Sequence, residues 1–197
     1  MKTRALKFDE LETVFLFIKS GVRKNGIKIR ANPQVHLICL IQLNTGLRIG
    51  DVLSLKVSDF VDGRLSIKEQ KTGKIQNRKI NYEVVKIVEA YCRKRFLSRN
   101  DNIFNISVRW VQKILKKISI CASIEGLSTH SFRKTYAHIQ YTNNKFNIEL
   151  VRRLLNHSSV SVTQKYLGIT DHDVNIASEG FKVIYIVSKN CNFKSCS

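Results

Sequence analysis

The chain has 197 residues, 43% of them hydrophobic, which suits one domain with a buried core or at most two small ones. Lys and Arg total 34 against 15 Asp and Glu, so the formal net charge is +19. This charge favours a polyanionic partner, and nucleic acid over a membrane surface, because the basic residues form no juxtamembrane block. Without a membrane-length apolar run or a signal-peptide pattern, we expect an intracellular, cytoplasmic protein.

The five cysteines are odd in number and irregularly spaced: Cys39, Cys92, Cys121, Cys191 and Cys196. This pattern is typical of reduced cytosolic thiols and not of a disulfide framework. The last two lie near each other, but no second pair or neighbouring histidine accompanies them, so the sequence predicts no zinc site. We expect no metal.

The N-terminal half is predicted to contain helices followed by a hairpin. Apolar spacing predicts helices at 9–19 and 33–43, the second with Pro33 in its first turn, and a short helix at 49–55. Residues 64–82 then alternate, with Leu65 and Ile67 on one face and Gly73 available for the turn. This alternation indicates a β-hairpin.

The C-terminal half is predicted to be mostly helical. Helical periodicity returns over 83–97, and Ser107 caps a helix at 107–120 whose apolar stripe consists of Val108, Val111, Ile114, Leu115 and Ile118. Short helices are expected at 129–141, 147–155 and 161–167, and a last one at 169–180, capped by Thr170. The apolar segment 181–190 can form a short edge strand.

These elements predict a mainly α fold with one small antiparallel β-sheet. No linker interrupts the chain, so we expect one domain over 1–180 and a tail over 181–197 that docks in cis or on a neighbouring protomer. Two side chains outside the functional motifs are interpreted as structural. His36 is expected on an apolar helix face, and Trp110 is expected to pack between helices.

Four separated segments carry side chains suited to phosphoryl transfer. TGLRIGDVLSL begins a short helix after a glycine turn, and EQKTGK forms the hairpin tip. THSFRKT places a histidine and an arginine three apart on one helix face, and LLNHSSVSVTQKYLG holds a loop histidine before a helical tyrosine. The candidate residues are Arg48, Lys71, His130, Arg133, His157 and Tyr166.

In this order the six residues resemble the pattern of the tyrosine recombinase, or phage integrase, family, over nearly the whole chain. The resemblance implies that family's catalytic-domain fold, a DNA breaking and rejoining enzyme, in which Asp51 matches the carboxylate that supports the site. A His-x-x-Arg pair or a KTGK turn alone is weakly specific, whereas the ordered combination is strongly specific.

The resemblance implies that Tyr166 attacks a DNA phosphorus and forms a 3′-phosphotyrosyl bond, in site-specific recombination of the integrase or invertase type. Arg48 and Arg133 would each present a planar fork to the phosphate oxygens. Lys71 would protonate the leaving 5′-oxygen, while His130 assists at the tyrosine and His157 donates to a non-bridging oxygen. Because the covalent link conserves the phosphodiester energy, no cofactor is expected.

Each residue taken alone also has an ordinary explanation. Arg48 can be a solvated helix-start residue, Tyr166 half-buried packing, His157 a helix cap, and Lys71 a turn charge. Further basic residues are assigned to the DNA backbone, with a solvated face as the alternative. They are Lys74, Arg109, Lys113, Lys116, Lys117 and Lys134.

Most family members carry a helical core-binding domain before the first arginine, but only 47 residues precede Arg48. The chain is either a fragment or a natural single-domain member, encoded by a bacterium, an archaeon, a virus or a mobile element. We therefore expect weak, salt-dependent binding to double-stranded DNA, assisted by self-association into a dimer or tetramer or by an accessory DNA-bending protein. The rival functions are a type IB topoisomerase and a catalytically silent DNA-binding regulator.

Overall fold

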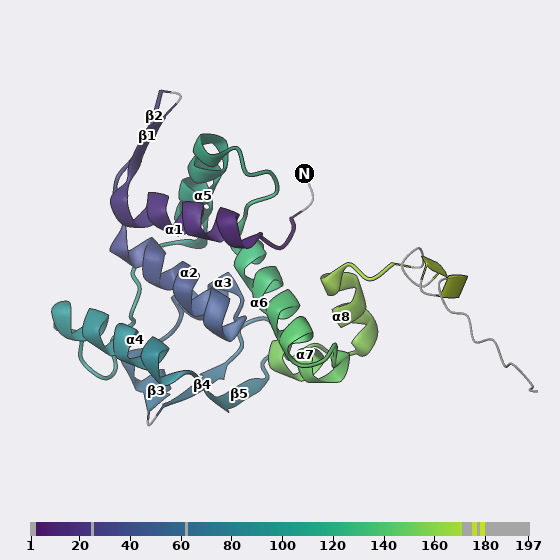
Figure 1. The fold of residues 1–197 in the computed structure, drawn as a ribbon. Coiled ribbons are helices and arrows are strands. Elements are labelled where there is room, and N and C mark those ends of the chain that lie inside the picture. The colour runs from purple at the N-terminus through teal and green to yellow at the C-terminus, as the bar shows by residue number, and fades with distance from the viewer. Residues whose placement is uncertain (1–2, 25, 62, 171–174, 177, 180–197) are drawn as a thin grey trace, which may run out of the picture.

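The computed structural model describes residues 3–24, 26–61, 63–170, 175–176 and 178–179 (Figure 1). Its α-helices are α1 Phe8–Ser20, α2 Pro33–Thr45, α3 Ile49–Leu53, α4 Tyr82–Lys94, α5 Val108–Ala122, α6 Thr129–Asn143, α7 Ile148–Leu155 and α8 Val160–Leu167. The strands are β1 Val22–Lys24, β2 Ile27–Ile29, β3 Phe60–Val61, β4 Arg64–Lys68 and β5 Ile75–Lys79, and a 3₁₀ turn spans Val57–Asp59. None of the helices in this part of the chain has the length and apolar character needed to cross a bilayer.

The mainly α architecture is confirmed, but the strands form two small antiparallel sheets instead of one. The predicted hairpin is β4 and β5, in which Leu65 pairs with Arg78 and Ile67 with Gln76, and β3 adds a third strand beside β4. The second sheet is the β1–β2 hairpin, which projects from the body next to α5 (Figure 1). It was not predicted.

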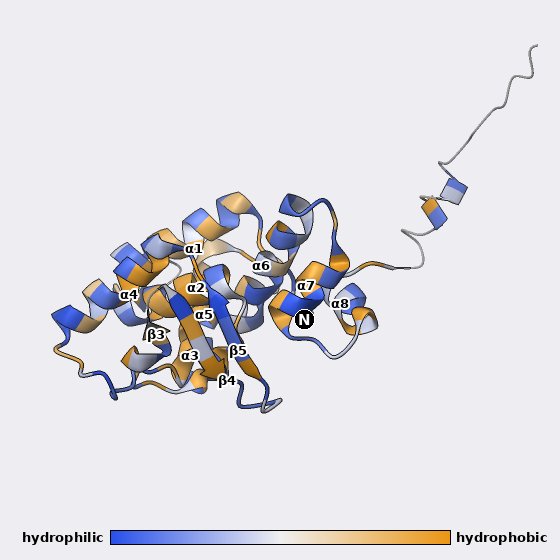
Figure 2. Cartoon of the chain, turned by 90° about the horizontal axis from the view of Figure 1, so that it is seen from below, coloured by the Kyte–Doolittle hydropathy of each residue, from blue (hydrophilic) through white to orange (hydrophobic). Residues whose placement is uncertain are grey.

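The main core forms around α2. Val35, Ile38 and Ile41 of this helix are fully buried, and α2 packs against α1 and α6. Figure 2 shows the hydrophobic stretches of α2 and α3 in the middle of the body. The stripe predicted on α5 is also buried at Val111, Leu115 and Ile118, so this helix is fixed by its apolar face and exposes its basic one.

A second, smaller cluster holds the last helices together. It joins α6, α7 and α8 through Tyr136, Ala137, Val151, Leu155 and Leu167. Figure 1 shows α7 and α8 together at one end of α6. This packing places the helix that carries Tyr166 against the helix that carries Arg133.

The helices predicted between residues 9 and 167 are confirmed with ends that differ by a few residues. The largest difference is α4, which ends at Lys94 instead of 97, because Phe96 adopts a positive φ of 55° and is 93% exposed. Most N-termini have side-chain caps, including Asn32, Ser107 and Ser128.

Trp110 was placed wrongly. It is 40% exposed on α5 and does not pack between helices. His36 is half-buried, with its ring edge-on to Phe15 at 5.2 Å between centroids, as expected for a structural residue.

Two sets of predictions at the C-terminus fall on undescribed residues. The last helix at 169–180 is described only in part, and the tail with its edge strand lies outside the described residues. Cys39, Cys92 and Cys121 are buried free thiols, while Cys191 and Cys196 also lie outside the described part.

Candidate active site

Arg48 is positioned by the turn that ends α2. Gly46 adopts a left-handed φ of 66°, and a Cβ at this position would lie 2.4 Å from the Tyr136 ring. Only glycine permits both the conformation and the close approach of α2 to α6. Arg48 then occupies the N-cap position of α3 without a capping bond from its side chain, 21% of which is exposed.

The partner of Arg48 is Glu69, a residue that the sequence analysis missed. Arg48 Nη1 donates to Glu69 Oε2 at 2.8 Å, and the carboxylate also accepts from the Thr72 hydroxyl at 2.6 Å and from the Gln76 amide. Burial alone would raise the pKa of Glu69, but the bond from Thr72 and the charge of Arg48 outweigh it, and the pKa is lowered. The strand alternation gave the signal, because Glu69 follows Leu65 and Ile67 on the inward face.

The hairpin turn that carries Lys71 is fastened to α3 by Asp51. Asp51 is buried, and its Oδ1 accepts the backbone N–H of Gln70 at 2.8 Å. Asp51 therefore supports the turn beside Lys71, and the carboxylate in contact with Arg48 is Glu69. Lys71 and Lys74 are both exposed at this turn.

Arg133 is the largest fully buried side chain of the described residues. The Ser128 cap starts α6 so that His130 and Arg133 lie in its first turns. The guanidinium of Arg133 donates to the carbonyl oxygens of Gly46 and of Leu155, the latter at 2.8 Å. Within the described residues no carboxylate forms an ion pair with it, and burial lowers the pKa of Arg133.

His157 bonds both of its ring nitrogens. It follows Asn156, whose left-handed φ of 55° ends α7. Nε2 lies 3.3 Å from Arg133 Nη2, and Nδ1 lies 3.1 Å from the Thr163 hydroxyl. A guanidinium only donates, so Nε2 accepts and Nδ1 carries the proton. Burial, then the charges of Arg133 and Arg48, lowers the pKa of His157 to about 4.

Tyr166 faces these two residues from the end of α8. Its ring is edge-on to His157 at 5.2 Å, and the guanidinium carbon of Arg133 lies 5.9 Å from the ring centroid. The phenol oxygen is buried, and no hydrogen bond of ordinary geometry reaches it from the described residues. Burial raises the pKa of Tyr166 although Arg133 and Arg48 oppose the change, so the phenol is neutral at pH 7.

His130 completes the group from the exposed end of α6. Partial burial lowers its pKa first, followed by the charges of Arg133, Arg48, Lys134 and Lys71. Five of the six candidate residues therefore come together in one protomer, and Lys71 lies on the adjoining turn. No group of three potential metal ligands occurs among the described residues.

The residues assigned to the DNA backbone separate into two groups. Five are exposed: Lys74, Arg109, Lys113, Lys116 and Lys117. Lys134 instead is half-buried, donates to the carbonyl of Thr3 at 3.0 Å, and lies 5.5 Å from the Tyr166 ring centroid. Lys134 is therefore a neighbour of Tyr166 in the fold and differs from the five exposed residues.

Comparison with known proteins extends this picture. The probable integrase/recombinase YoeC of Bacillus subtilis is 30% identical over 161 residues, covering 78% of this chain and 87% of YoeC. The tyrosine recombinase XerC of Caldanaerobacter subterraneus is 28% identical, covering 72% of this chain and 43% of XerC. The chain thus spans most of one relative and less than half of the other.

The fold is similar to that of a solved recombinase. The crystal structure of the XerH site-specific recombinase bound to a palindromic difH substrate, a post-cleavage complex, matches with a TM-score of 0.67 at 21% identity, over 91% of this chain and 53% of XerH. The model of the phage integrase family matches residues 4–172. With this match over most of its length, the chain belongs to the phage integrase family.

Proposed function

We propose that this chain is a site-specific DNA recombinase that cuts and rejoins DNA through a covalent bond between Tyr166 and a phosphate. The observation that carries the proposal is the buried phenol beside Arg133 and His157, which no hydrogen bond of ordinary geometry reaches from the described residues. A buried polar group without a hydrogen bond costs about 1–3 kcal/mol, and such a cost is common where a ligand completes the site.

Arg133 and Arg48 are the residues we assign to the phosphate. The two carbonyl bonds and the contact to His157 hold the Arg133 guanidinium in place, but they leave its positive charge without a paired anion among the described residues. A phosphate would supply that anion. Arg48 gives Nη1 to Glu69 and keeps its remaining donors for a second phosphate oxygen.

In the cleavage step, the oxygen of Tyr166 forms a bond to phosphorus while the bond to the 5′-oxygen breaks. The phenol proton leaves through His130, whose lowered pKa makes it a neutral acceptor at pH 7. Lys71 gives a proton to the departing 5′-oxygen. A 5′-hydroxyl of a second strand later attacks the phosphotyrosine, which restores the phenol and the phosphodiester.

The role of His157 is revised by its hydrogen bonds. With Nε2 accepting from Arg133, this nitrogen has no proton for a non-bridging oxygen. We therefore assign His157 to holding Arg133 and the Tyr166 ring. It becomes a donor to the phosphate only after it is protonated or changes tautomer.

The partner is double-stranded DNA, with several copies of the chain acting together. Each chain has one Tyr166, whereas exchange between two duplexes requires every one of their strands to be cut. We therefore propose a dimer on each duplex and a tetramer when two duplexes exchange strands. An accessory DNA-bending protein would add the binding energy that a core-binding domain supplies in most family members. Its need is tested by adding such a protein to the purified reaction.

The decisive experiment traps the covalent intermediate. A duplex with a nick beside the cleavage position and randomised flanks is incubated with the protein, and adducts are resolved on a denaturing gel and sequenced. We expect an adduct with the wild type and none with Tyr166→Phe. An adduct of equal yield with Tyr166→Phe would exclude this tyrosine as the nucleophile, and no adduct with the wild type would favour a silent DNA-binding regulator.

A plasmid relaxation assay distinguishes the recombinase from the alternative, a type IB topoisomerase. Multiple-turnover relaxation of a supercoiled plasmid, without preference among captured sequences, would favour a topoisomerase. Joining of two DNAs that carry the same captured sequence would favour the recombinase.

A further inference from the structure

A basic groove of about 410 Å³ lies between α5 and the β1–β2 hairpin, apart from the candidate active site. Lys28 and Arg30 line it from the hairpin side, and Trp110, Lys113 and Lys117 line it from α5. We call these five residues the hairpin groove. All five are exposed, and none of the described residues that line the groove is Asp or Glu.

The geometry of α5 explains why these side chains gather. Lys113 and Lys117 follow Trp110 by three and seven residues, so the three lie on one face of the helix. The opposite face is buried in the core through Leu115 and Ile118. The antiparallel β1–β2 pair then brings Lys28 against this exposed face, since β2 contacts α5.

Four cations repel one another where the described lining holds no Asp or Glu, so an anionic partner is favoured in the groove. Trp110 points to a partner with an apolar part as well, because its ring is 40% exposed and its indole N–H is a donor. A DNA backbone offers both, with phosphate oxygens for the cations and deoxyribose for the ring.

The position of the groove favours DNA that is already bound at the candidate active site. Helix α5 contacts α3 and α6, the helices whose first turns carry Arg48 and His130. Figure 1 shows α3 between α5 and the β4–β5 hairpin, whose turn carries Lys71. One duplex can therefore reach from the active site to the groove.

We propose that the hairpin groove binds the phosphate backbone of the duplex, away from the cleavage position, and supplies a second grip on the DNA. This inference rests on the proposed function, since it takes the duplex to be the one cleaved by Tyr166. Each phosphate contact contributes about five-fold to affinity at 0.15 M salt, as calculated from a salt slope of about 0.9 per contact.

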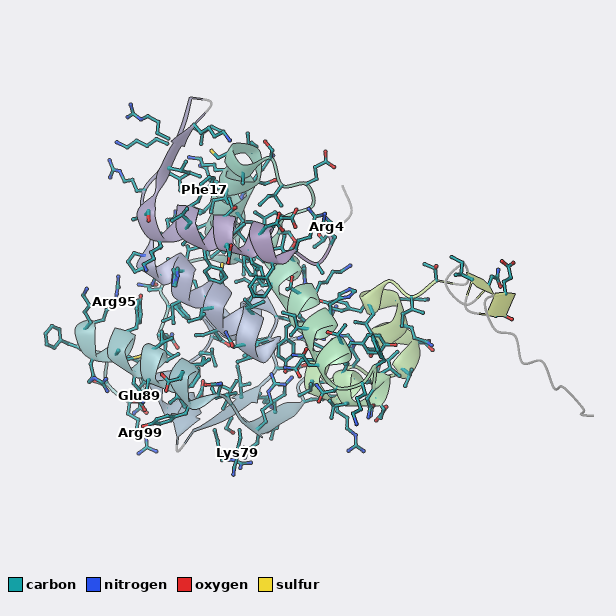
Figure 3. All side chains as sticks on the ribbon, in the orientation of Figure 1. Arg4, Phe17, Lys79, Glu89, Arg95 and Arg99 are labelled. Carbon is teal, nitrogen blue, oxygen red and sulfur yellow. The ribbon has the colours of Figure 1, made fainter. Side chains whose placement is uncertain are left out.

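The test compares two matched double variants, each removing one lysine and one arginine. Lys28→Ala with Arg30→Ala alters the groove. Lys94→Ala with Arg99→Ala alters two exposed residues elsewhere, the last residue of α4 and a residue of the loop that follows it, labelled Arg99 in Figure 3. Binding to the captured duplex is measured by fluorescence anisotropy between 0.05 and 0.3 M salt. We expect the groove variant to bind about 30-fold more weakly at 0.15 M salt, with a slope lower by about 2, and the control to change little.

A duplex trimmed from each end in turn gives the second measurement. Trimming on the groove side should weaken the wild type to the level of the groove variant, whose own binding should not change. Covalent capture at saturating DNA should proceed at the wild-type rate in both variants. Two outcomes would overturn the inference. In the first, the groove variant and the control variant lose the same amount of affinity. In the second, the groove variant binds more weakly than the wild type by the same factor on both trimmed duplexes. If the wild type forms no adduct, the two variants are compared on a duplex of random sequence. A loss of binding there by the groove variant alone would mean that the proposed function fails while the groove remains a DNA-binding surface.

Discussion

Replacement of Glu69 by glutamine tests how the site is held. The carboxylate accepts hydrogen bonds from Arg48, Thr72 and Gln76, whereas an amide offers one acceptor and an NH₂ group that faces a donor. Removing one partner of a buried ion pair costs about 3–5 kcal/mol. Because Arg48 keeps 21% of its side chain exposed and can regain water, we expect the lower end, about 3 kcal/mol.

The same change should slow cleavage. Arg48 would lose the bond that fixes its guanidinium, and the turn that carries Lys71 would lose its link through Thr72. Misplacement of a catalytic group by about 1 Å can cost about 100-fold in rate. We expect covalent capture at saturating DNA to fall by about 10–100-fold, under conditions where the variant is still folded.

Two measurements check this prediction: urea unfolding, and the single-turnover rate of adduct formation. Glu89→Gln is the control, because Glu89 is an exposed residue of α4 (Figure 3) whose carboxylate lies 3.7 Å from Arg93, and such pairs contribute about 0–1 kcal/mol. The double variant with Arg48→Ala should be no slower than Arg48→Ala alone. A Glu69→Gln protein that captured DNA at the wild-type rate would refute the reasoning.

Three further predictions follow from the same geometry. The pKa of His157 is about 4 when folded and near 6.5 when unfolded, so the unfolded chain binds the proton first as the pH falls. The free energy of unfolding should therefore drop by up to about 3 kcal/mol between pH 6.5 and 4, and urea titrations should show no such drop from this site in His157→Gln. Arg133→Lys should slow adduct formation by at least about 100-fold on a denaturing gel, because an ammonium cannot replace the planar fork. Gly46→Ala should lower stability by about 2–4 kcal/mol in urea unfolding, since its Cβ would overlap the Tyr136 ring; an unchanged midpoint would contradict this.

The helices were predictable because their local signals agree. Ser107 and Ser128 cap their helices as such residues do, and the stripe through Val111, Leu115 and Ile118 is buried as its period indicates. The β1–β2 hairpin was missed although Asn25–Gly26 is a strong turn signal, because each strand has only three residues and gives little alternation to detect. Trp110 was misplaced although its spacing to Lys113 and Lys117 puts it on the polar face.

The site was predictable as a set of residue types and much less as a set of contacts. The order of arginine, lysine, histidine and tyrosine motifs identified the candidates, but the carbonyl oxygens that hold Arg133 belong to Gly46 and Leu155, at separations of 87 and 22 residues. No local rule specifies such bonds, because they depend on how α2, α6 and α7 meet. Glu69 is an intermediate case, since the alternation of β4 indicates its burial but not its partner.

Arg133 and Tyr166 both break the rules that stabilise a folded chain, and they do so side by side. A buried guanidinium normally has a carboxylate, and a buried phenol normally has a hydrogen bond. Here the guanidinium contacts carbonyl dipoles and a neutral imidazole, and no hydrogen bond of ordinary geometry from the described residues reaches the phenol. Either defect alone could be a packing compromise, but a single phosphate would correct both, because its oxygens can pair with the cation and accept a hydrogen bond from the phenol. Two unfavourable features that one ligand corrects are expected of a site selected for ligand binding at the expense of stability.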